Sequence, residues 1–180
     1  MEQLIGNHRE DYISREAYHM GIAVLSAMRS KDPSTQVGAC IVSEDNRILS
    51  TGYNGTPNGI EDVHFNWERE GDALCTKYPY VIHAEANAIL NFRGNMQDMK
   101  GAVIFVTLFP CNECAKLIVQ SGIQKVVYLS DKYHDKRESL AARKIFDACG
   151  VETVQYCDGT GEISILFEEA RNAKTETGMD

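Results

Sequence analysis

AVIFVTLFPCNECAKLIVQSGIQKVVYLS, residues 102–130, is the stretch that decides the fold of this chain. Residues 102–107 and 125–130 are short apolar runs rich in β-branched and aromatic side chains, which predict buried strands. Between them, residues 111–121 carry apolar side chains at helical spacing and predict a helix. A strand, a helix and a second strand in this order indicate two parallel strands joined by a helical crossover.

The same alternation of strand and helix patterns extends on both sides of this unit. Ser14 is the expected N-cap of the first helix, and Gly150 is the expected stop of the last. Turn formers at residues 43–46 predict that the first two strands form an antiparallel hairpin. Residues 55–76 show neither the helical nor the strand spacing of apolar residues, so they predict a long loop. The other predicted helices lie at residues 14–30, 83–92 and 138–149, and the other strands at residues 37–42, 47–53 and 151–156.

Together these elements predict an α/β fold, a sandwich of helices around a mixed sheet. A chain of 180 residues has the usual length of one domain. We therefore expect residues 1–180 to form a single domain with a core at about residues 11–169. The polar segment after residue 167 is expected to be a frayed C-terminal tail.

Composition and charge narrow the classes of function. The N-terminal segment MEQLIGNH lacks the basic patch and apolar run of a signal peptide, and no later stretch is apolar enough to cross a bilayer. We therefore expect a cytoplasmic protein with no membrane partner. The net charge of −8 and the scattered Lys and Arg residues oppose binding to a nucleic acid polymer. Any phosphate that is bound should belong to a small molecule.

Four residues carry the chemistry: His83 and Glu85 in the motif HAE, and Cys111 and Cys114 in the motif PCNEC. Two cysteines three positions apart at a helix start can direct both thiolates at one Zn²⁺ ion, and His83 can supply the third ligand from another helix start. Three ligands leave the fourth tetrahedral position open for water, as in catalytic zinc sites. Glu85 is then the candidate acid–base residue. H-x-E with P-C-x-x-C is the established signature of the zinc deaminases.

Other interpretations of the cysteine pair fit the sequence less well. A lone C-x-x-C is commoner as half of a four-cysteine structural zinc site or as a redox pair. The structural site would need a second close pair, but Cys40, Cys75, Cys149 and Cys157 are isolated. A redox pair would not explain the preceding proline or the distant HAE motif. A regulatory module with a structural zinc would have no need of Glu85, so a catalytic zinc is the favoured hypothesis.

From about residue 11 to residue 169, the chain resembles the deoxycytidylate deaminases of the cytidine deaminase superfamily. The most specific segments are LFPCNECAK at residues 108–116 and DKYHD at residues 131–135. The resemblance implies a three-layer α/β/α sandwich, in which a five-stranded mixed sheet has helices on both faces, and zinc at two helix N-termini. Further similar segments are SKDP at residues 30–33, QVGA at residues 36–39, GYNG at residues 52–55 and TKYPY at residues 76–80.

This resemblance also implies an activity and a set of contacts. The implied reaction is hydrolysis of dCMP to dUMP and ammonia, which supplies dUMP for dTMP synthesis. The implied assembly is a homohexamer that is activated by dCTP with Mg²⁺ and inhibited by dTTP. The implied substrate contacts are the backbone around Val37 to Ala39 for the base, Ser30 and Lys31 for the 5′-phosphate, and Tyr133; the implied effector contacts are Asn58, Gly59 and Glu61. Asn54, at the end of a strand and before a glycine turn, is the candidate contact for the sugar.

Several alternatives stay open on the sequence alone. Asn54 could be an ordinary turn asparagine with positive φ, and Lys31 could be a charge at a helix C-terminus. The long loop could be a solvated surface of an unregulated enzyme. The substrate could instead be dCTP, cytidine or a methylated analogue, and enzymes that deaminate a base in RNA or single-stranded DNA use the same ligands.

Overall fold

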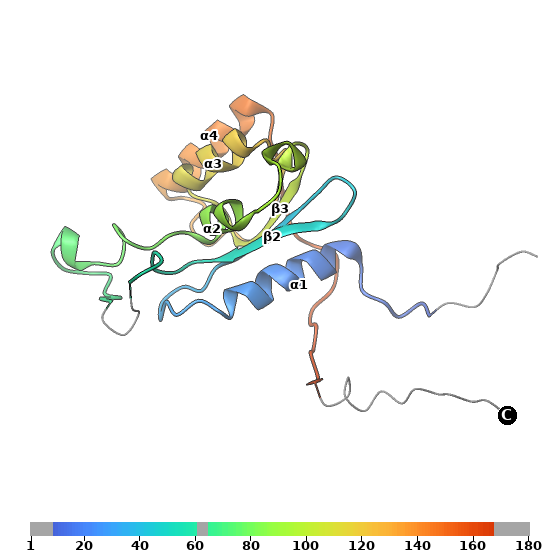
Figure 1. Cartoon of the computed structure of the whole chain (residues 1–180), viewed down its shortest axis with the longest axis horizontal. Helices are drawn as coiled ribbons and strands as arrows, with labels where there is room; N and C mark the ends of the chain where they lie inside the picture. Colours follow the sequence, from blue (N-terminus) through green and yellow to red (C-terminus); the bar gives the residue numbers. More distant parts are fainter. Residues whose placement is uncertain (1–8, 61–64, 168–180) are drawn as a thin grey trace, which may run out of the picture.

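Helices and strands follow one another along the chain in the predicted order (Figure 1). The computed structural model describes residues 9–60 and 65–167, so the expected tail after residue 167 lies outside the described residues. Within the two described ranges, no helix is both long and apolar enough to cross a bilayer. The elements are α1 (Arg15–Ala27), β1 (Gly38–Val42), β2 (Ile48–Tyr53), η2 (Ala73–Cys75), α2 (Ala84–Asn91), η3 (Met96–Met99), β3 (Val103–Leu108), α3 (Asn112–Ser121), β4 (Lys125–Ser130), α4 (Arg137–Cys149) and β5 (Glu152–Gln155).

Five strands form one mixed sheet in the order β2-β1-β3-β4-β5. Strand β1 is antiparallel to β2 and to β3, whereas β3, β4 and β5 are parallel to one another. The hairpin and the helical crossovers produce this pattern, because a strand can run parallel to its predecessor only after a long crossover connection. The predicted five-stranded mixed sheet is confirmed. As a consequence, β3 and β4 end at the same edge of the sheet.

Helices cover both faces of this sheet (Figure 1), with α1 on one face and α2, α3 and α4 on the other. Strand β1 shows how its side chains divide between the two faces. Ala39 and Ile41 pack into the larger core beneath α2, α3 and α4, whereas Cys40 and Val42 pack with Met20 of α1. Successive strand residues point to opposite faces, so both helical layers are held by the same strand. The predicted three-layer sandwich is confirmed.

Two glycines allow helices to approach the sheet closely. A Cβ at Gly52 of β2 would lie 2.3 Å from the carbonyl oxygen of Ala84 and from the backbone nitrogen of Ala88, both in α2. A Cβ at Gly38 of β1 would lie 1.9 Å from the carbonyl oxygen of Ala23 in α1. Such distances are far inside van der Waals contact, so only glycine fits at these positions. Gly52 thereby sets where α2 lies.

The helix ends agree with the predictions to within a few residues. The Ser14 side chain accepts a hydrogen bond from the first turn of α1, and Gly150 ends α4 with a φ of 70°. The predicted long loop is partly structured, because Gly55 pairs with Ile82 in an isolated antiparallel bridge and η2 lies between them. The short helix η3 has no counterpart in the sequence pattern, since one turn is too short to show a helical period.

Candidate active site

The N-termini of α2 and α3 bring together the three predicted metal ligands. His83 is the N-cap of α2 and Cys111 is the N-cap of α3, and neither side chain caps its own helix. The Sγ atoms of Cys111 and Cys114 each lie 3.4 Å from Nδ1 of His83. All three ligand atoms lie within 4.8 Å of one another. Among the residues that the structure describes, no other three His, Cys, Asp or Glu side chains form such a group.

The chemistry of these donors fits a zinc ion, which takes imidazole nitrogen and thiolate sulfur in tetrahedral geometry. A hydrogen bond with Cys114 lowers the pKa of Cys111 to about 4, and the same contact together with burial raises the pKa of Cys114. The protein groups by themselves therefore favour one thiolate and one thiol. A bound divalent cation would favour loss of the second proton, because metal ligation requires deprotonated sulfur. Three protein ligands would leave one coordination position open.

Glu85 lies in the first turn of α2, next to these ligands but outside the ligand group. Its side chain is buried, with an exposed fraction of 4%. Burial raises the pKa of this carboxyl, while the nearby His83 opposes that effect. The Cys114 side chain also has a small lowering effect on this pKa. A carboxyl with a raised pKa binds a proton more readily than an ordinary Glu, which is the property expected of an acid–base residue.

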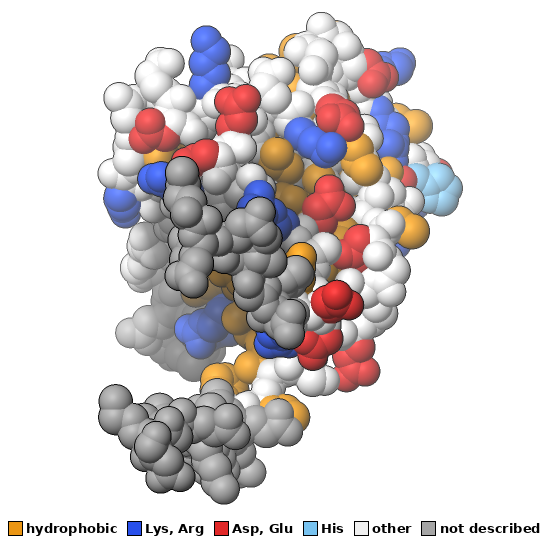
Figure 2. All heavy atoms as spheres, turned by 90° about the vertical axis from the view of Figure 1, so that its right-hand side faces the viewer, with side chains coloured by type: hydrophobic (Ala, Val, Ile, Leu, Met, Phe, Trp, Pro, Cys, Tyr) orange, Lys and Arg blue, Asp and Glu red, His pale blue; other side chains and the backbone are white. Residues whose placement is uncertain are grey.

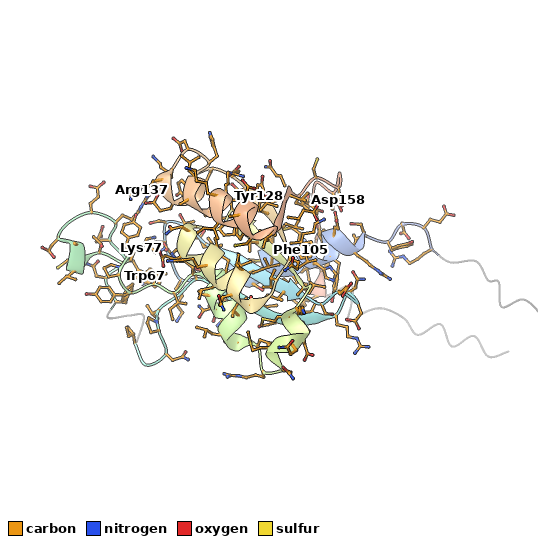
Figure 3. All side chains as sticks on the ribbon, turned by 90° about the horizontal axis from the view of Figure 1, so that it is seen from above. Trp67, Lys77, Phe105, Tyr128, Arg137 and Asp158 are labelled. Atoms are coloured by element: carbon orange, nitrogen blue, oxygen red, sulfur yellow. The ribbon has the colours of Figure 1, made fainter. Side chains whose placement is uncertain are left out.

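His83, Glu85 and Cys111 line a cavity of about 390 Å³. The cavity lies at the sheet edge where β3 and β4 end, which is the usual position of ligand sites beside parallel strands. Viewed from above, Lys77 and the start of α4 at Arg137 lie toward this end of the molecule, and Asp158 lies at the opposite end (Figure 3). The other lining residues are Asp32, Thr35, Val37, Asn54, Arg69, Lys77, Tyr78, Val81, Ala84, Leu108, Phe109, Tyr133, Lys136, Glu138 and Ser139.

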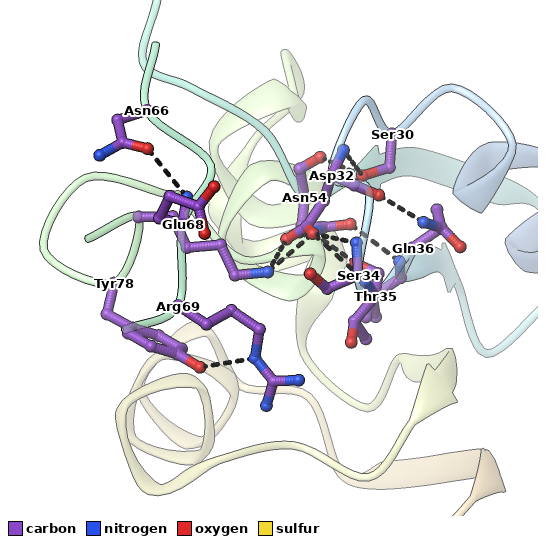
Figure 4. Close-up of polar contacts among 12 residues, drawn as sticks. Ser30, Asp32, Ser34, Thr35, Gln36, Asn54, Asn66, Glu68, Arg69 and Tyr78 are labelled. Carbon is purple, nitrogen blue, oxygen red and sulfur yellow. Dashed lines mark hydrogen bonds and ion pairs between the residues drawn. The ribbon is translucent and has the colours of Figure 1, made fainter. Parts of the chain in front are cut away.

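Asn54 is held rigidly in the wall of this cavity (Figure 4). Its Oδ1 accepts the N–H of Val37 at 2.8 Å, and its Nδ2 donates to the carbonyl oxygen of Thr35 at 3.0 Å. Asn54 does not have the positive φ of a left-handed turn residue. Among the described residues other than glycine, that conformation is found at Asn46. The side chain therefore shapes the wall of the cavity and does not serve a local turn.

The remaining implied substrate contacts are distributed over three places. Tyr133 and Val37 line the cavity, whereas the Ala39 side chain is fully buried in the core on the face of β1 that α2, α3 and α4 cover. The Ser30 hydroxyl donates to the backbone oxygen of Asn54 at 2.9 Å. The structure does not place Lys31 among the residues that line this cavity.

Lys31 instead lines a second cavity of about 430 Å³ on the other side of Asn54. Asp32 explains the separation, because its carboxylate accepts the N–H groups of Ser34 and Thr35 and turns the chain at this point. Arg29 and Lys31, before the turn, line the second cavity, whereas Thr35 and Val37, after it, line the first. The second cavity is also lined by Arg29, Tyr53, Gly55, Thr56, Pro57, Asn58, Gly59, Ile60, Ile82, Asn87, Leu90, Asn91 and Arg93; Glu61 lies outside the described residues.

Four further cationic or phenolic residues line the first cavity without a role assigned from sequence: Arg69, Lys77, Tyr78 and Lys136. Arg69 donates to the Tyr78 hydroxyl at 3.1 Å. Lys77 and Tyr78 belong to the TKYPY segment noted above, but the motif alone does not say which way each side chain points. Arg69 lies in the long loop, where no periodic pattern indicates a position in space.

Comparison with known proteins agrees with this geometry. Residues 13–130 match the family described as the cytidine and deoxycytidylate deaminase zinc-binding region. Deoxycytidylate deaminase of Homo sapiens is 48% identical over 177 residues, which cover 98% of each chain. The probable deoxycytidylate deaminase of Drosophila melanogaster is 49% identical over 166 residues, covering 89% of this chain and 81% of its own.

A solved structure supports the same relationship. The dCMP deaminase of cyanophage S-TIM5, crystallised in complex with dCMP and dUMP, is 28% identical with a TM-score of 0.62 and covers 81% of this chain and 100% of its own. The match to the zinc-binding region includes both the HAE and the PCNEC motifs, which the fold brings to one site. This chain therefore belongs to the cytidine and deoxycytidylate deaminase family.

Proposed function

We propose that this protein hydrolyses the amino group of dCMP and releases dUMP and ammonia. The observation that carries the proposal is the burial of Glu85 beside His83, Cys111 and Cys114 in the wall of a cavity. A structural metal site would not need a buried acid–base group facing a cavity. The deoxycytidylate deaminases, which are 48% identical over nearly the whole chain, support the same activity.

His83, Cys111 and Cys114 would hold the zinc ion. When bound, zinc acts as a Lewis acid that lowers the pKa of water and so makes hydrolysis possible near neutral pH. Glu85 takes a proton from the attacking water and gives it to N3 of cytosine as the water oxygen adds to C4. Glu85 then takes the remaining proton from the new C4 hydroxyl and passes it to the amino group. The C4–O bond becomes a carbonyl as the C4–N4 bond breaks, and ammonia leaves.

Recognition of the nucleotide uses the wall on either side of Asn54. Val37 and Asn54 line this cavity, and we assign the backbone at Val37 to the base and Asn54 to the sugar. Arg69 and Lys136, which line the same cavity as Tyr133, are the cationic groups that we assign to the 5′-phosphate. Ser30 supports this wall through the backbone of Asn54. A charge-assisted contact to phosphate is worth about 1.5–3 kcal/mol, so dCMP should exceed deoxycytidine by about 10- to 150-fold in kcat/KM.

A free nucleotide is a better substrate than a polymer on grounds of charge. The net charge is −8. The face of the molecule in Figure 2 carries acidic side chains along much of its right-hand side, with basic side chains scattered among them. A protein that tracks a nucleic acid backbone needs a continuous basic surface, because most of its affinity comes from the phosphates.

The second cavity is the proposed site of the effectors dCTP and dTTP. It is lined by the cationic side chains of Arg29, Lys31 and Arg93 and by the expected effector contacts Asn58 and Gly59. Three cations suit a triphosphate, with Mg²⁺ neutralising part of its charge. Lys31 is accordingly assigned here to effector phosphates. A homohexamer is the proposed assembly, because cooperative regulation requires linked sites.

A substrate panel tests the proposed function. Release of ammonia is measured with deoxycytidine, cytidine, dCMP, CMP, dCTP, 5-methyl-dCMP and a single-stranded oligodeoxynucleotide, using enzyme loaded with one zinc per chain. We expect dCMP to have the highest kcat/KM. The Glu85→Gln variant gives the background rate of ammonia release. Equal rates with deoxycytidine and dCMP would indicate a nucleoside deaminase. No release from any substrate would contradict an enzymatic role.

A further inference from the structure

Lys77 and Asp32 form a buried ion pair that the proposed reaction does not use. The Nζ atom of Lys77 lies 2.7 Å from Oδ1 and 2.5 Å from Oδ2 of Asp32, and the two side chains are 7% and 3% exposed. Among the residues that the structure describes, no other ion pair has both partners buried. The desolvation of a buried pair can exceed its Coulombic gain, so stability alone does not account for this one.

Asp32 connects this ion pair to the wall of the active-site cavity (Figure 4). Its Oδ1 accepts the N–H of Ser34 at 2.8 Å and the N–H of Thr35 at 3.2 Å. Its Oδ2 accepts from Nδ2 of Asn54 at 3.4 Å, and Asn54 in turn holds the N–H of Val37. The Lys77 ammonium contacts both oxygens of this carboxylate and so fixes their orientation toward these donors.

Lys77 also connects the ion pair to the segment that leads to the metal ligands. Its N–H donates to the carbonyl oxygen of Glu68 at 2.9 Å, and its carbonyl oxygen accepts the N–H of Val81 at 3.0 Å. The next residue, Ile82, exchanges two backbone hydrogen bonds with Gly55, which follows Asn54. The chain then enters α2 at His83. Lys77 thus lies between the substrate wall and the start of the catalytic helix.

We propose that Lys77 is a positioning residue, which through its ion pair with Asp32 holds the Asn54 side chain and residues 34–37 in the geometry of the substrate wall. This inference rests on the proposed deamination of dCMP. Lys77 lines the cavity, so direct contact with the 5′-phosphate is the competing role. Its ammonium group, however, contacts both oxygens of Asp32 and is nearly inaccessible, which favours the positioning role.

Kinetics of the Lys77→Met variant separate the two roles. Positioning predicts that kcat/KM falls by about 10- to 100-fold for dCMP and by the same factor for deoxycytidine, because misplacement of the wall affects the base and sugar of both. The matched control is Lys125→Met, which removes a lysine from the partly exposed pair with Glu152 and should match wild type. A loss confined to dCMP, or no loss beyond that of the control, would overturn the proposal.

The double variant Asp32→Asn/Lys77→Met keeps the test decisive where the single variant folds poorly. Removing both charges avoids an uncompensated buried carboxylate, so the double variant should fold better than Lys77→Met. It should nevertheless remain impaired for both substrates, since the amide is a weaker acceptor for the backbone of residues 34–37. A double variant that folds and has wild-type kinetics would contradict the positioning role.

Hydrogen exchange provides a measurement that does not depend on activity. The amides of Ser34, Thr35 and Val37 donate to Asp32 and Asn54, so they should exchange at least about 10-fold faster in Lys77→Met than in wild type or Lys125→Met. Unchanged exchange would overturn the proposal even if activity fell. If wild type released no ammonia from dCMP, the proposed function would fail, and the exchange rates would still decide whether Lys77 holds this wall.

Discussion

Cys111 and Cys114 lie within one turn of each other, yet Cys114 is buried and Cys111 is partly accessible from the cavity. Both sulfurs are needed for a three-ligand site, because His83 supplies a single nitrogen. We expect Cys111→Ala to lose bound zinc and nearly all activity. The control is Cys149→Ala, which removes an exposed cysteine at the end of α4. Metal analysis that found one zinc per chain in Cys111→Ala would contradict the assigned ligands.

Glu85 presents a different case at the same scale, because its proposed role is proton transfer and not binding of the metal. Gln has nearly the same shape and can still accept a hydrogen bond, but it cannot carry a proton. We therefore expect Glu85→Gln to keep its zinc and its thermal stability, while kcat falls by about 10²- to 10⁴-fold. Steady-state assay of ammonia release, with zinc content measured on the same sample, checks this. A near-normal kcat would remove Glu85 from the mechanism.

At the scale of elements, the contact between α2 and β2 positions both His83 and Glu85. Gly52 sets this contact, because a Cβ there would meet backbone atoms of Ala84 and Ala88. We expect Gly52→Ala to lower the free energy of unfolding by about 1–3 kcal/mol. This corresponds to a fall in Tm of about 2–4 °C for each kcal/mol in a chain of this size. Zinc content and kcat should fall as well, since α2 has to move.

Gly161→Ala is the matched control for this prediction. An added Cβ at Gly161 meets no atom within 4 Å, and its φ is not in the left-handed region. The control should therefore keep the Tm, the zinc content and the kcat of wild type. If thermal unfolding and activity assays gave the same values for Gly52→Ala and Gly161→Ala, the close approach of α2 to β2 would not determine the site.

At the scale of the whole molecule, Asn54 separates two cavities and lines both of them. A ligand in the second cavity therefore borders the wall that the substrate contacts in the first. We expect dCTP with Mg²⁺ to convert a sigmoidal dCMP curve into a hyperbolic one and dTTP to oppose this. A coupling free energy of about 1–3 kcal/mol would change the affinity for dCMP roughly 5- to 150-fold. Initial rates, measured on a preparation whose mass is determined by light scattering, check this.

The same experiment decides the role of Lys31. As an effector contact, Lys31→Ala should raise the dCTP concentration needed for half-maximal activation and leave the preference for dCMP over deoxycytidine unchanged. If Lys31→Ala instead lowered the preference for dCMP over deoxycytidine, Lys31 would be a contact of the substrate 5′-phosphate. Hyperbolic dCMP kinetics that neither triphosphate alters, in a preparation shown to be oligomeric, would contradict the regulatory proposal and leave the catalytic one intact.

Local patterns in the sequence determined much of this molecule. Helices and strands have periods of a few residues, so the sandwich, the Ser14 cap and the Gly150 stop could be predicted. The catalytic motifs are equally local, because HAE and PCNEC each lie at the start of a helix. The fold then needs only to bring two helix N-termini together, as it does at His83 and Cys111.

Tertiary structure alone decided which way the residues between these elements face. The sequence groups Ser30 with Lys31, but the turn held by Asp32 sends Lys31 to the second cavity. Lys77 lies 45 positions from Asp32, and no local period relates the two, so their buried pair could not be read from the sequence. Such contacts arise from the path of the whole chain, because burial and partner choice are settled only when distant segments pack together.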